Sequence, residues 1–119
     1  PLAAIALTDN IASLTAIGND YAYEQVFSRQ IEGLGKRGDV AVGLSTSGRS
    51  LNVIAALAAA RRRGLCTVGL TAGEGGSMPD VCDLCIRVPS RTTARIQEAH
   101  LLIGHIFCQL VDVQLGVKA

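Results

Sequence analysis

The chain of 119 residues has few aromatic and few charged side chains. Tryptophan is absent, aromatic residues make up 3% and charged residues 18% of the sequence. Eleven basic residues stand against ten acidic ones, which gives a net charge of +1. Proteins that bind nucleic acid usually present a basic surface, often with aromatic rings for stacking on bases. The composition therefore argues against nucleic acid as a direct ligand.

Long apolar runs and secretion signals are also missing. Residues 1–7 are apolar, but the segment is too short to span a membrane and lacks a charged flank. The cysteines lie in or beside apolar segments. They lack the even spacing that would be typical of a secreted disulfide-rich domain. They are Cys66, Cys82, Cys85 and Cys108. We expect all four to be reduced, buried thiols in a cytoplasmic protein that makes no membrane contact.

Cys82 and Cys85 form a single CxxC pair within an apolar segment. A zinc ribbon needs a second pair, and a redox motif needs a helix that begins directly after the first cysteine. A strand here would place the two sulfurs on opposite faces. The pattern predicts buried structural thiols.

Strand-like and helix-like segments alternate along the chain. Strands are expected at residues 2–7, 39–44, 65–71 and 81–88, and helices at 23–34, 51–63 and 93–115. Strands that are apolar on both faces and separated by helices favour a parallel sheet covered on both sides. No linker or repeat interrupts the pattern, so residues 1–119 are expected to form one α/β domain.

The segment 45–50 stands between an apolar strand pattern and an alanine-rich helix pattern. Its hydroxyl-bearing residues are Ser45, Thr46, Ser47 and Ser50, and Gly48 would let a ligand approach the backbone. A serine cap needs one hydroxyl, whereas a phosphate at a helix N-terminus uses several donors. The lysine of a nucleotide-binding P-loop is absent. The segment therefore predicts a site for a phosphate monoester.

Ligands of open parallel sheets lie beyond the carboxyl ends of the strands. Asn19, Asp20 and Thr71 are further candidates at that edge, whereas the glycine-rich residues 72–76 are better explained as a turn. In the last helix, Gln97 and His105 lie about 80° apart around the axis, and His100 points elsewhere. A lone helical histidine is more often a packing residue than a catalyst, so the spacing leaves the role of His105 open. The expected packing stripe is Ile96, Ala99, Ile103, Ile106, Leu110 and Val113.

Three segments together resemble the phosphoheptose isomerase (sedoheptulose 7-phosphate isomerase) family of SIS domain proteins. They are Gly18-Asn19-Asp20-Tyr21, the serine segment 45–50, and Arg95-Ile96-Gln97-Glu98-Ala99-His100 with His105. The resemblance extends over essentially the whole chain and implies a flavodoxin-like three-layer sandwich. It also implies a homotetramer in which the long helices pack together.

The resemblance implies a role for each motif. Ser45, Thr46, Ser47 and Ser50 would bind the substrate phosphate, and Asn19, Asp20 and Gln97 would contact the sugar. Gln97 and His105 would bind Zn²⁺, and His105 would also be the acid/base residue of an enediol mechanism. The product would be D-glycero-D-manno-heptose 7-phosphate, a precursor of ADP-heptose and the lipopolysaccharide core.

Two features depart from the family pattern. Arg49 stands where the family usually has Asn, which adds positive charge beside the phosphate. The family completes its metal site with a His and a Glu on a helix after a first strand and a glycine-rich loop, and no such segment precedes Pro1. We therefore expect that this chain lacks its N-terminal third, binds zinc poorly and is inactive alone.

Two other functions remain open at this point. One is a non-catalytic SIS protein that binds the replication initiator and shares the serine loop and the Arg-Ile-Gln-Glu run. It carries Asn at the position of His105, so the histidine favours the isomerase. The other is a sugar-phosphate sensor without turnover.

Overall fold

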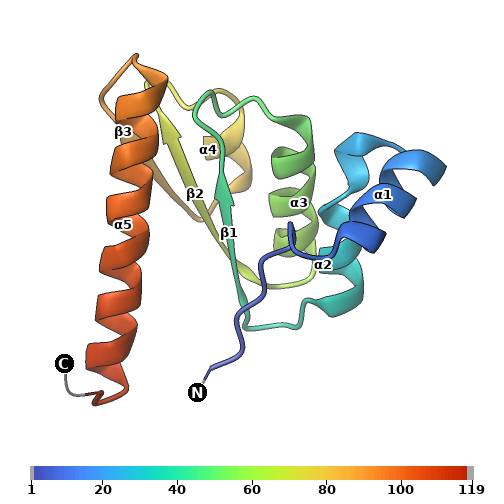
Figure 1. Cartoon of the computed structure of the whole chain (residues 1–119), viewed down its shortest axis with the longest axis horizontal. Coiled ribbons are helices and arrows are strands. Elements are labelled where there is room, and N and C mark those ends of the chain that lie inside the picture. The colour runs from blue at the N-terminus through green and yellow to red at the C-terminus, as the bar shows by residue number, and fades with distance from the viewer. Residues whose placement is uncertain (1, 118–119) are drawn as a thin grey trace.

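A computed structural model describes residues 2–117 and contains a parallel sheet with helices on both faces (Figure 1). Along the chain the elements are α1 (Ile11–Asp20), the 3₁₀ helix η1 (Tyr23–Gln25), α2 (Ser28–Leu34), β1 (Val40–Leu44), α3 (Leu51–Arg62), β2 (Cys66–Ala72), α4 (Met78–Val81), β3 (Leu84–Val88) and α5 (Thr93–Gln114). The predicted α/β class with a parallel sheet is confirmed.

The sheet has three strands in the order β1-β2-β3, and both neighbouring pairs are parallel. In the register, Val42 pairs with Val68, and Gly69 pairs with Cys85. Because β2 is central, its Thr67, Leu70 and Thr71 are completely or almost completely buried. The carboxyl ends of all three strands meet at one edge, which is where the serine segment follows β1.

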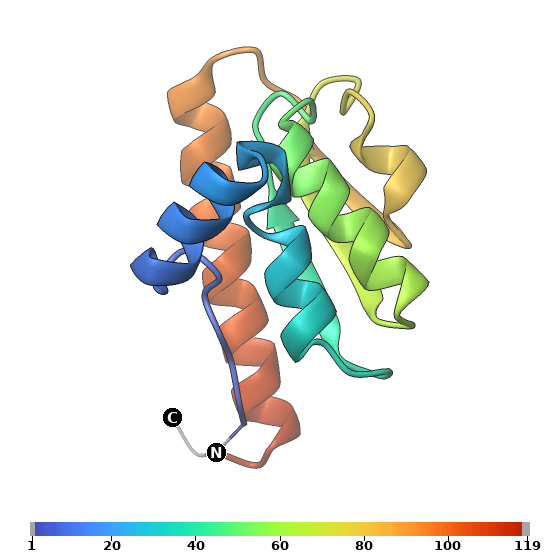
Figure 2. The ribbon, with the colours of Figure 1, turned by 90° about the vertical axis from the view of Figure 1, so that its right-hand side faces the viewer.

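The core lies between the sheet and the helices α2, α3 and α4 (Figure 2). One cluster joins Ile31 of α2 to Ala59 and Ala60 of α3, and a second joins Leu57 to Met78. Gly43 of β1 allows this close packing, since a Cβ there would lie 2.8 Å from Cδ1 of Leu57. The alanine-rich helix α3 therefore packs directly onto β1.

Four predicted elements are confirmed to within one or two residues: the strands at 39–44 and 65–71, and the helices at 51–63 and 93–115. Gly64 follows α3 with a φ of 79°, as expected of the residue that ends a helix.

The strand predicted at residues 2–7 is wrong. In the structure these residues form no strand, and Leu2 and Ile5 are exposed. A strand needs a neighbour for its backbone hydrogen bonds, and in the part of the chain that the structure describes the sheet contains only β1, β2 and β3. The segment is instead held at its end, where Nε2 of Gln30 donates to the carbonyl of Leu7 (3.0 Å).

Two boundaries also differ from the prediction. The helix expected at 23–34 begins as η1 and becomes α-helical only at Ser28. The strand expected at 81–88 begins at Leu84, because residues 78–81 form the short helix α4. Helix α1 was not predicted, although Asn10 gives its signal: the Asn10 side chain accepts a hydrogen bond from the N–H of Ser13 and caps the helix.

Helices do not cover the whole sheet. Val40, Val42 and Leu44 point to the face opposite α3 and remain 61%, 47% and 53% exposed. Helix α5 contacts β2 and β3 on that face, and its buried residues are Ile96 and His100. Of the predicted stripe down α5, Ile96 is buried among the residues that the structure describes, whereas Ile106, Leu110 and Val113 are exposed there.

Candidate functional site

The serine segment 45–50 connects β1 to α3 at the carboxyl edge of the sheet. Ser45 is buried, and its N–H donates to the carbonyl of Leu70 in β2 (3.0 Å), which fixes the start of the loop. The N–H of Gly48 then donates to the carbonyl of Ser45 (3.0 Å) and closes a turn. Gly48 has a φ of 63°, a left-handed conformation that glycine adopts at least cost.

The hydroxyls of this loop have different environments. The Oγ atoms of Ser45 and Ser50 share a hydrogen bond of 2.9 Å. Ser47 is exposed, and its Oγ accepts a hydrogen bond from the N–H of Arg49 (3.3 Å). Thr46 is half-buried. The structure thus brings Ser45 and Ser50 together, with Ser47 on the open side of the loop.

Ser50 occupies the N-cap position of α3, yet its hydroxyl makes no capping hydrogen bond. Its Oγ is engaged by Ser45 instead. Backbone N–H groups at the start of α3 are therefore not occupied by the cap side chain and carry the partial positive charge of a helix N-terminus. This geometry suits a phosphate group, which accepts several hydrogen bonds at once.

A second loop supports the first. The N–H of Ser77 donates to the carbonyl of Gly48 (3.0 Å), and a Cβ on Gly48 would lie 1.8 Å from the carbonyl oxygen of Gly75. The turn predicted at residues 72–76 is confirmed, with the N–H of Gly75 donating to the carbonyl of Ala72 (2.9 Å). The sequence did not lead us to expect that this turn packs against the serine loop. The glycines in both loops were the available signal for that contact.

Two arginines lie beside these loops. Cγ of Arg49 is 2.8 Å from the position that a Cβ on Gly76 would take, and Cδ of Arg87 is 3.3 Å from the corresponding position on Gly75. Both side chains are exposed. Two positive charges therefore lie beside the glycine loop, which itself carries the exposed Glu74, and the two arginines favour an anionic ligand. Sequence reasoning found Arg49 and missed Arg87.

Asn19 and Asp20 lie at the end of α1, and both are exposed. Nδ2 of Asn19 donates to Oδ1 of Asp20 (2.8 Å). The end of α1 lies at the same end of the molecule as the start of α3 (Figures 1 and 2). Among residues 2–117, no hydrogen bond joins this pair to the serine loop.

Helix α5 carries the remaining candidates on the other face of the sheet from α3 (Figure 1). Gln97 and His105 are exposed, whereas His100 is buried and its Nε2 donates to the carbonyl of Thr71 (3.1 Å). His100 therefore faces the sheet, whereas Gln97 and His105 are open to solvent. It is a hydrogen-bonded packing residue that ties α5 to the end of β2.

Gln97 and His105 supply two donors for a metal ion. Within residues 2–117, no group of three or more His, Cys, Asp or Glu side chains is placed to hold a metal. Zinc in proteins usually takes three or four protein ligands. The described residues therefore do not make a complete zinc site.

The cysteine pair differs from its prediction in geometry. Sγ of Cys82 and Sγ of Cys85 lie 2.7 Å and 3.5 Å from one point, the position of a Cβ on Gly69, so the sulfurs are not on opposite faces. The reason is that Cys82 follows α4 and is not part of β3. Burial raises the pKa of the Cys82 thiol to about 11 and also raises the pKa of Cys85. Both thiols are free and suit packing rather than nucleophilic chemistry. The expectation of burial is wrong for Cys66 and Cys108, which are exposed.

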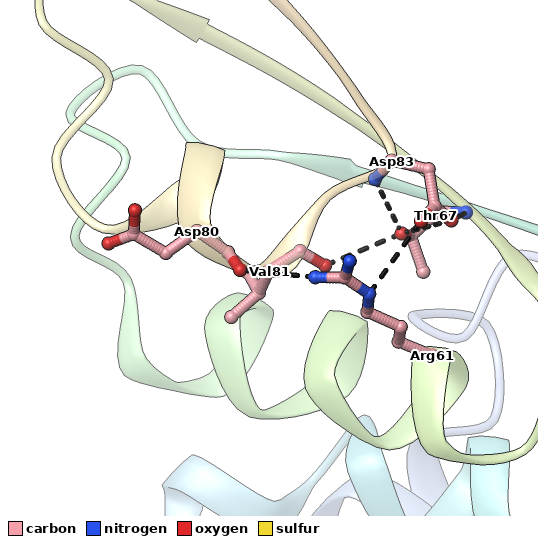
Figure 3. A network of polar contacts seen from close by, with 5 residues as sticks. All are labelled: Arg61, Thr67, Asp80, Val81 and Asp83. Atoms are coloured by element: carbon pink, nitrogen blue, oxygen red, sulfur yellow. Dashed lines mark hydrogen bonds and ion pairs between the residues drawn. The ribbon is translucent and has the colours of Figure 1, made fainter.

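Another polar cluster lies at the amino end of β2 (Figure 3). The N–H and the hydroxyl of Thr67 both donate to Oδ2 of Asp83 (2.8 and 2.9 Å), and the hydroxyl accepts from the N–H of Asp83 (2.9 Å). Arg61 of α3 adds an ion pair with Asp83 (3.6 Å). These bonds lower the pKa of Asp83 and fix the start of β3 to β2. The cluster is structural, since the serine loop lies at the opposite end of the strands.

The described residues form an α/β domain in which a serine-rich loop connects the edge strand of a parallel sheet to a helix. This places the chain among small α/β domains with anion-binding geometry. The profile of the SIS domain family matches residues 1–72. That is more than half of the chain, and the chain belongs to the SIS domain family.

Curated relatives within this family are phosphoheptose isomerases. The Rhodospirillum rubrum protein is 54% identical over 112 residues, which cover 94% of this chain and 60% of the relative. Phosphoheptose isomerase 2 of Campylobacter jejuni is 51% identical over 117 residues, covering 98% of this chain and 58% of the relative. The predicted family is confirmed, and these relatives give no support to the replication regulator. The chain spans about three fifths of the length of both.

Two solved structures share the fold closely. Phosphoheptose isomerase GmhA from Neisseria gonorrhoeae superposes with a TM-score of 0.91 at 48% identity, covering 94% of this chain and 62% of that one. A phosphoheptose isomerase from Francisella tularensis gives a TM-score of 0.91 at 40% identity, with 94% and 60% covered. No helix among residues 2–117 has the length and apolar character needed to span a membrane.

Proposed function

We propose that the protein to which these residues belong is a phosphosugar isomerase that converts sedoheptulose 7-phosphate into D-glycero-D-manno-heptose 7-phosphate. The observation that carries the proposal is the serine loop at the start of α3, in a chain about half identical to phosphoheptose isomerases. The loop would bind the phosphate through Ser45, Thr46, Ser47, Ser50 and the N–H groups of α3.

The remaining candidates then act on the sugar. Asn19, Asp20 and Gln97 would bind its hydroxyls, and all three are exposed to receive it. His105 would be the acid/base group: a base removes a proton from C1 of the ketose while O2 gains one, which gives the enediol. The enediol then takes a proton at C2 while O1 loses one, which gives the aldose. The same number of protons is removed and returned, so no oxidant or reductant is needed.

The test is turnover of sedoheptulose 7-phosphate by the intact natural chain that carries these residues, followed by NMR of the sugar product. Variant His105→Ala is expected to lose turnover by at least about 100-fold while it still binds the substrate. Variant Ser47→Ala is expected to weaken binding of the phosphate ester. Binding without turnover by the unaltered chain would identify a sugar-phosphate sensor and contradict the isomerase.

We also propose that residues 1–119 alone bind Zn²⁺ weakly and lack isomerase activity. Gln97 and His105 are two donors where zinc usually has three or four, so no step of the reaction is derived through the metal. Calorimetric titration of this chain with Zn²⁺ tests the proposal. Tight binding that His105→Ala abolishes would contradict it. Zn²⁺ as the cofactor of the intact protein stays a prediction.

We propose the metabolic role, the cellular location and the assembly of the protein on the same basis. An isomerase of this specificity supplies a precursor for ADP-heptose and the lipopolysaccharide core. Free thiols at all four cysteines are in keeping with a cytoplasmic location. The exposed apolar residues of α5 support assembly of several copies through this helix, with a homotetramer as the expected state.

A further inference from the structure

The side chain of Thr71 is completely buried, and its hydroxyl finds no hydrogen-bond partner within residues 2–117. Buried hydroxyls in proteins are almost always hydrogen-bonded, because a lost bond to water is otherwise not replaced. A completely buried hydroxyl without a hydrogen bond therefore requires a physical explanation.

Thr67 provides the comparison within the same strand. It lies four residues earlier on the same face of β2 and is equally buried. Its hydroxyl is fully used, since it donates to the carboxylate of Asp83 and accepts from the N–H of Asp83 (Figure 3). Burial in β2 thus does not by itself prevent a threonine from finding partners. What differs is the position of Thr71 at the carboxyl end of the strand.

At that end, the hydroxyl of Thr71 lies directly behind the serine loop. Its Oγ1 is 2.9 Å from the position that a Cβ on Gly48 would take, and the carbonyl oxygen of Gly75 is 1.8 Å from the same position. A hydroxyl donor and a carbonyl acceptor therefore approach Gly48 from one side. The backbone of Thr71 is fixed, because its carbonyl accepts from His100.

We propose that Thr71 is a positioning residue for the serine loop, whose unpartnered hydroxyl gains a hydrogen bond to the backbone of Gly48 when the loop binds a phosphate monoester. The inference rests on the phosphate site proposed above. Thr71 would act through Gly48 and would not touch the sugar. The hydrogen bond that the hydroxyl gains would then increase the affinity for the phosphate ester. It would not increase the stability of the protein in the absence of the ester.

Three variants of the intact natural chain test this inference. Thr71→Val removes the hydroxyl at nearly constant shape, Thr71→Ser keeps it, and Thr67→Val removes a hydroxyl that is already bonded. The dissociation constants of sedoheptulose 7-phosphate and of inorganic phosphate are measured by calorimetry, and the unfolding midpoint is measured without either compound.

We expect Thr71→Val to weaken binding of both compounds about five-fold, the effect of one hydrogen bond. Its unfolding midpoint should stay unchanged or rise, because an unsatisfied group is removed. Thr71→Ser should keep the affinity. Thr67→Val should behave in the opposite way, with a lower midpoint and unchanged affinity.

Three outcomes would overturn the inference. If the unaltered chain binds phosphate compounds and Thr71→Val binds them equally well, the role of Thr71 is wrong while the phosphate site stands. If Thr71→Val lowers the unfolding midpoint as much as Thr67→Val does, the hydroxyl is structural. If the unaltered chain binds neither compound, the phosphate site itself is wrong and the role of Thr71 is wrong with it.

Discussion

At the scale of single residues, Gly48 shows how tightly the serine loop packs against the glycine loop. Its positive φ disfavours a side chain, and a Cβ would collide with the carbonyl of Gly75. We expect Gly48→Ala to destabilise the protein by about 2–5 kcal/mol, the sum of a backbone and an overpacking cost. Chemical denaturation measures the change.

The matched control is Gly73→Ala. Gly73 has a similar φ of 55°, but a Cβ there would meet nothing within 4 Å. The control isolates the backbone cost, which should be about 1–2 kcal/mol. Equal effects of the two substitutions would show that the contact between the two loops does not constrain Gly48.

Asp83 gives the stability of the fold a predictable dependence on pH. Hydrogen bonds from Thr67 lower its pKa below the ordinary value of 3.8, so the folded chain takes up this proton less readily than the unfolded chain. The stabilisation is complete above that ordinary value and is lost as the pH falls through the lowered pKa. The unfolding midpoint should therefore fall in acid below about pH 4.

Variant Asp83→Asn tests this dependence, because it removes the titrating carboxyl. Thermal unfolding between pH 2 and 6 should give a smaller acid-induced loss than in the unaltered chain, in line with linkage over roughly that range. Asp112→Asn, on the exposed surface of α5, is the control. An unchanged pH profile for Asp83→Asn would mean that the Thr67 bonds do not stabilise the carboxylate.

At the scale of the elements, α5 is the least constrained by packing. It is 22 residues long, contains Gly104 in its interior, and contacts the sheet mainly on β2 and β3. Because a Cβ on Gly104 would meet nothing within 4 Å, Gly104→Ala should stabilise the protein by about 0.5–1 kcal/mol. Chemical denaturation of the chain at low protein concentration measures the change.

Gly43→Ala is the opposing control, because a Cβ in β1 would lie 2.8 Å from Leu57. It should destabilise by about 1–3 kcal/mol through overpacking against α3. A loss of stability in Gly104→Ala would indicate that another chain packs closely against this glycine.

At the scale of the whole molecule, an apolar surface is open to solvent. Exposed apolar residues lie on β1 and on the C-terminal half of α5, where Leu110 and Val113 are 55% and 64% exposed. Exposed apolar patches of this kind are typical of protein interfaces. We therefore expect the chain to self-associate through α5.

The double variant Leu110→Lys, Val113→Lys tests this expectation. It should lower the mass measured by size-exclusion chromatography with light scattering, because buried lysines at the contact are costly. The control places lysine on the exposed part of the domain away from α5, at Tyr23. A monomeric unaltered chain at micromolar concentration would contradict the role of α5.

Local sequence by itself determined the elements whose residues carry their own signals. The strands at 39–44 and 65–71 are short apolar runs, and the helix at 51–63 has an alanine-rich pattern with a glycine at its end. The hydroxyl cluster of segment 45–50 was also visible, because its chemistry depends on neighbouring residues in one loop. The family followed from three such local motifs and was confirmed.

The tertiary structure decided what depends on partners distant in the chain. Residues 2–7 have the composition of a strand but pair with no strand among the residues that the structure describes, and the C-terminal half of the stripe predicted on α5 is exposed there. Three features arise only when loops meet in space: the shared position of Cys82 and Cys85, the contact of Gly75 with Gly48, and the Thr71 hydroxyl, which has no partner within residues 2–117. Burial and hydrogen bonding depend on which distant segments come into contact, and therefore no local pattern encodes them.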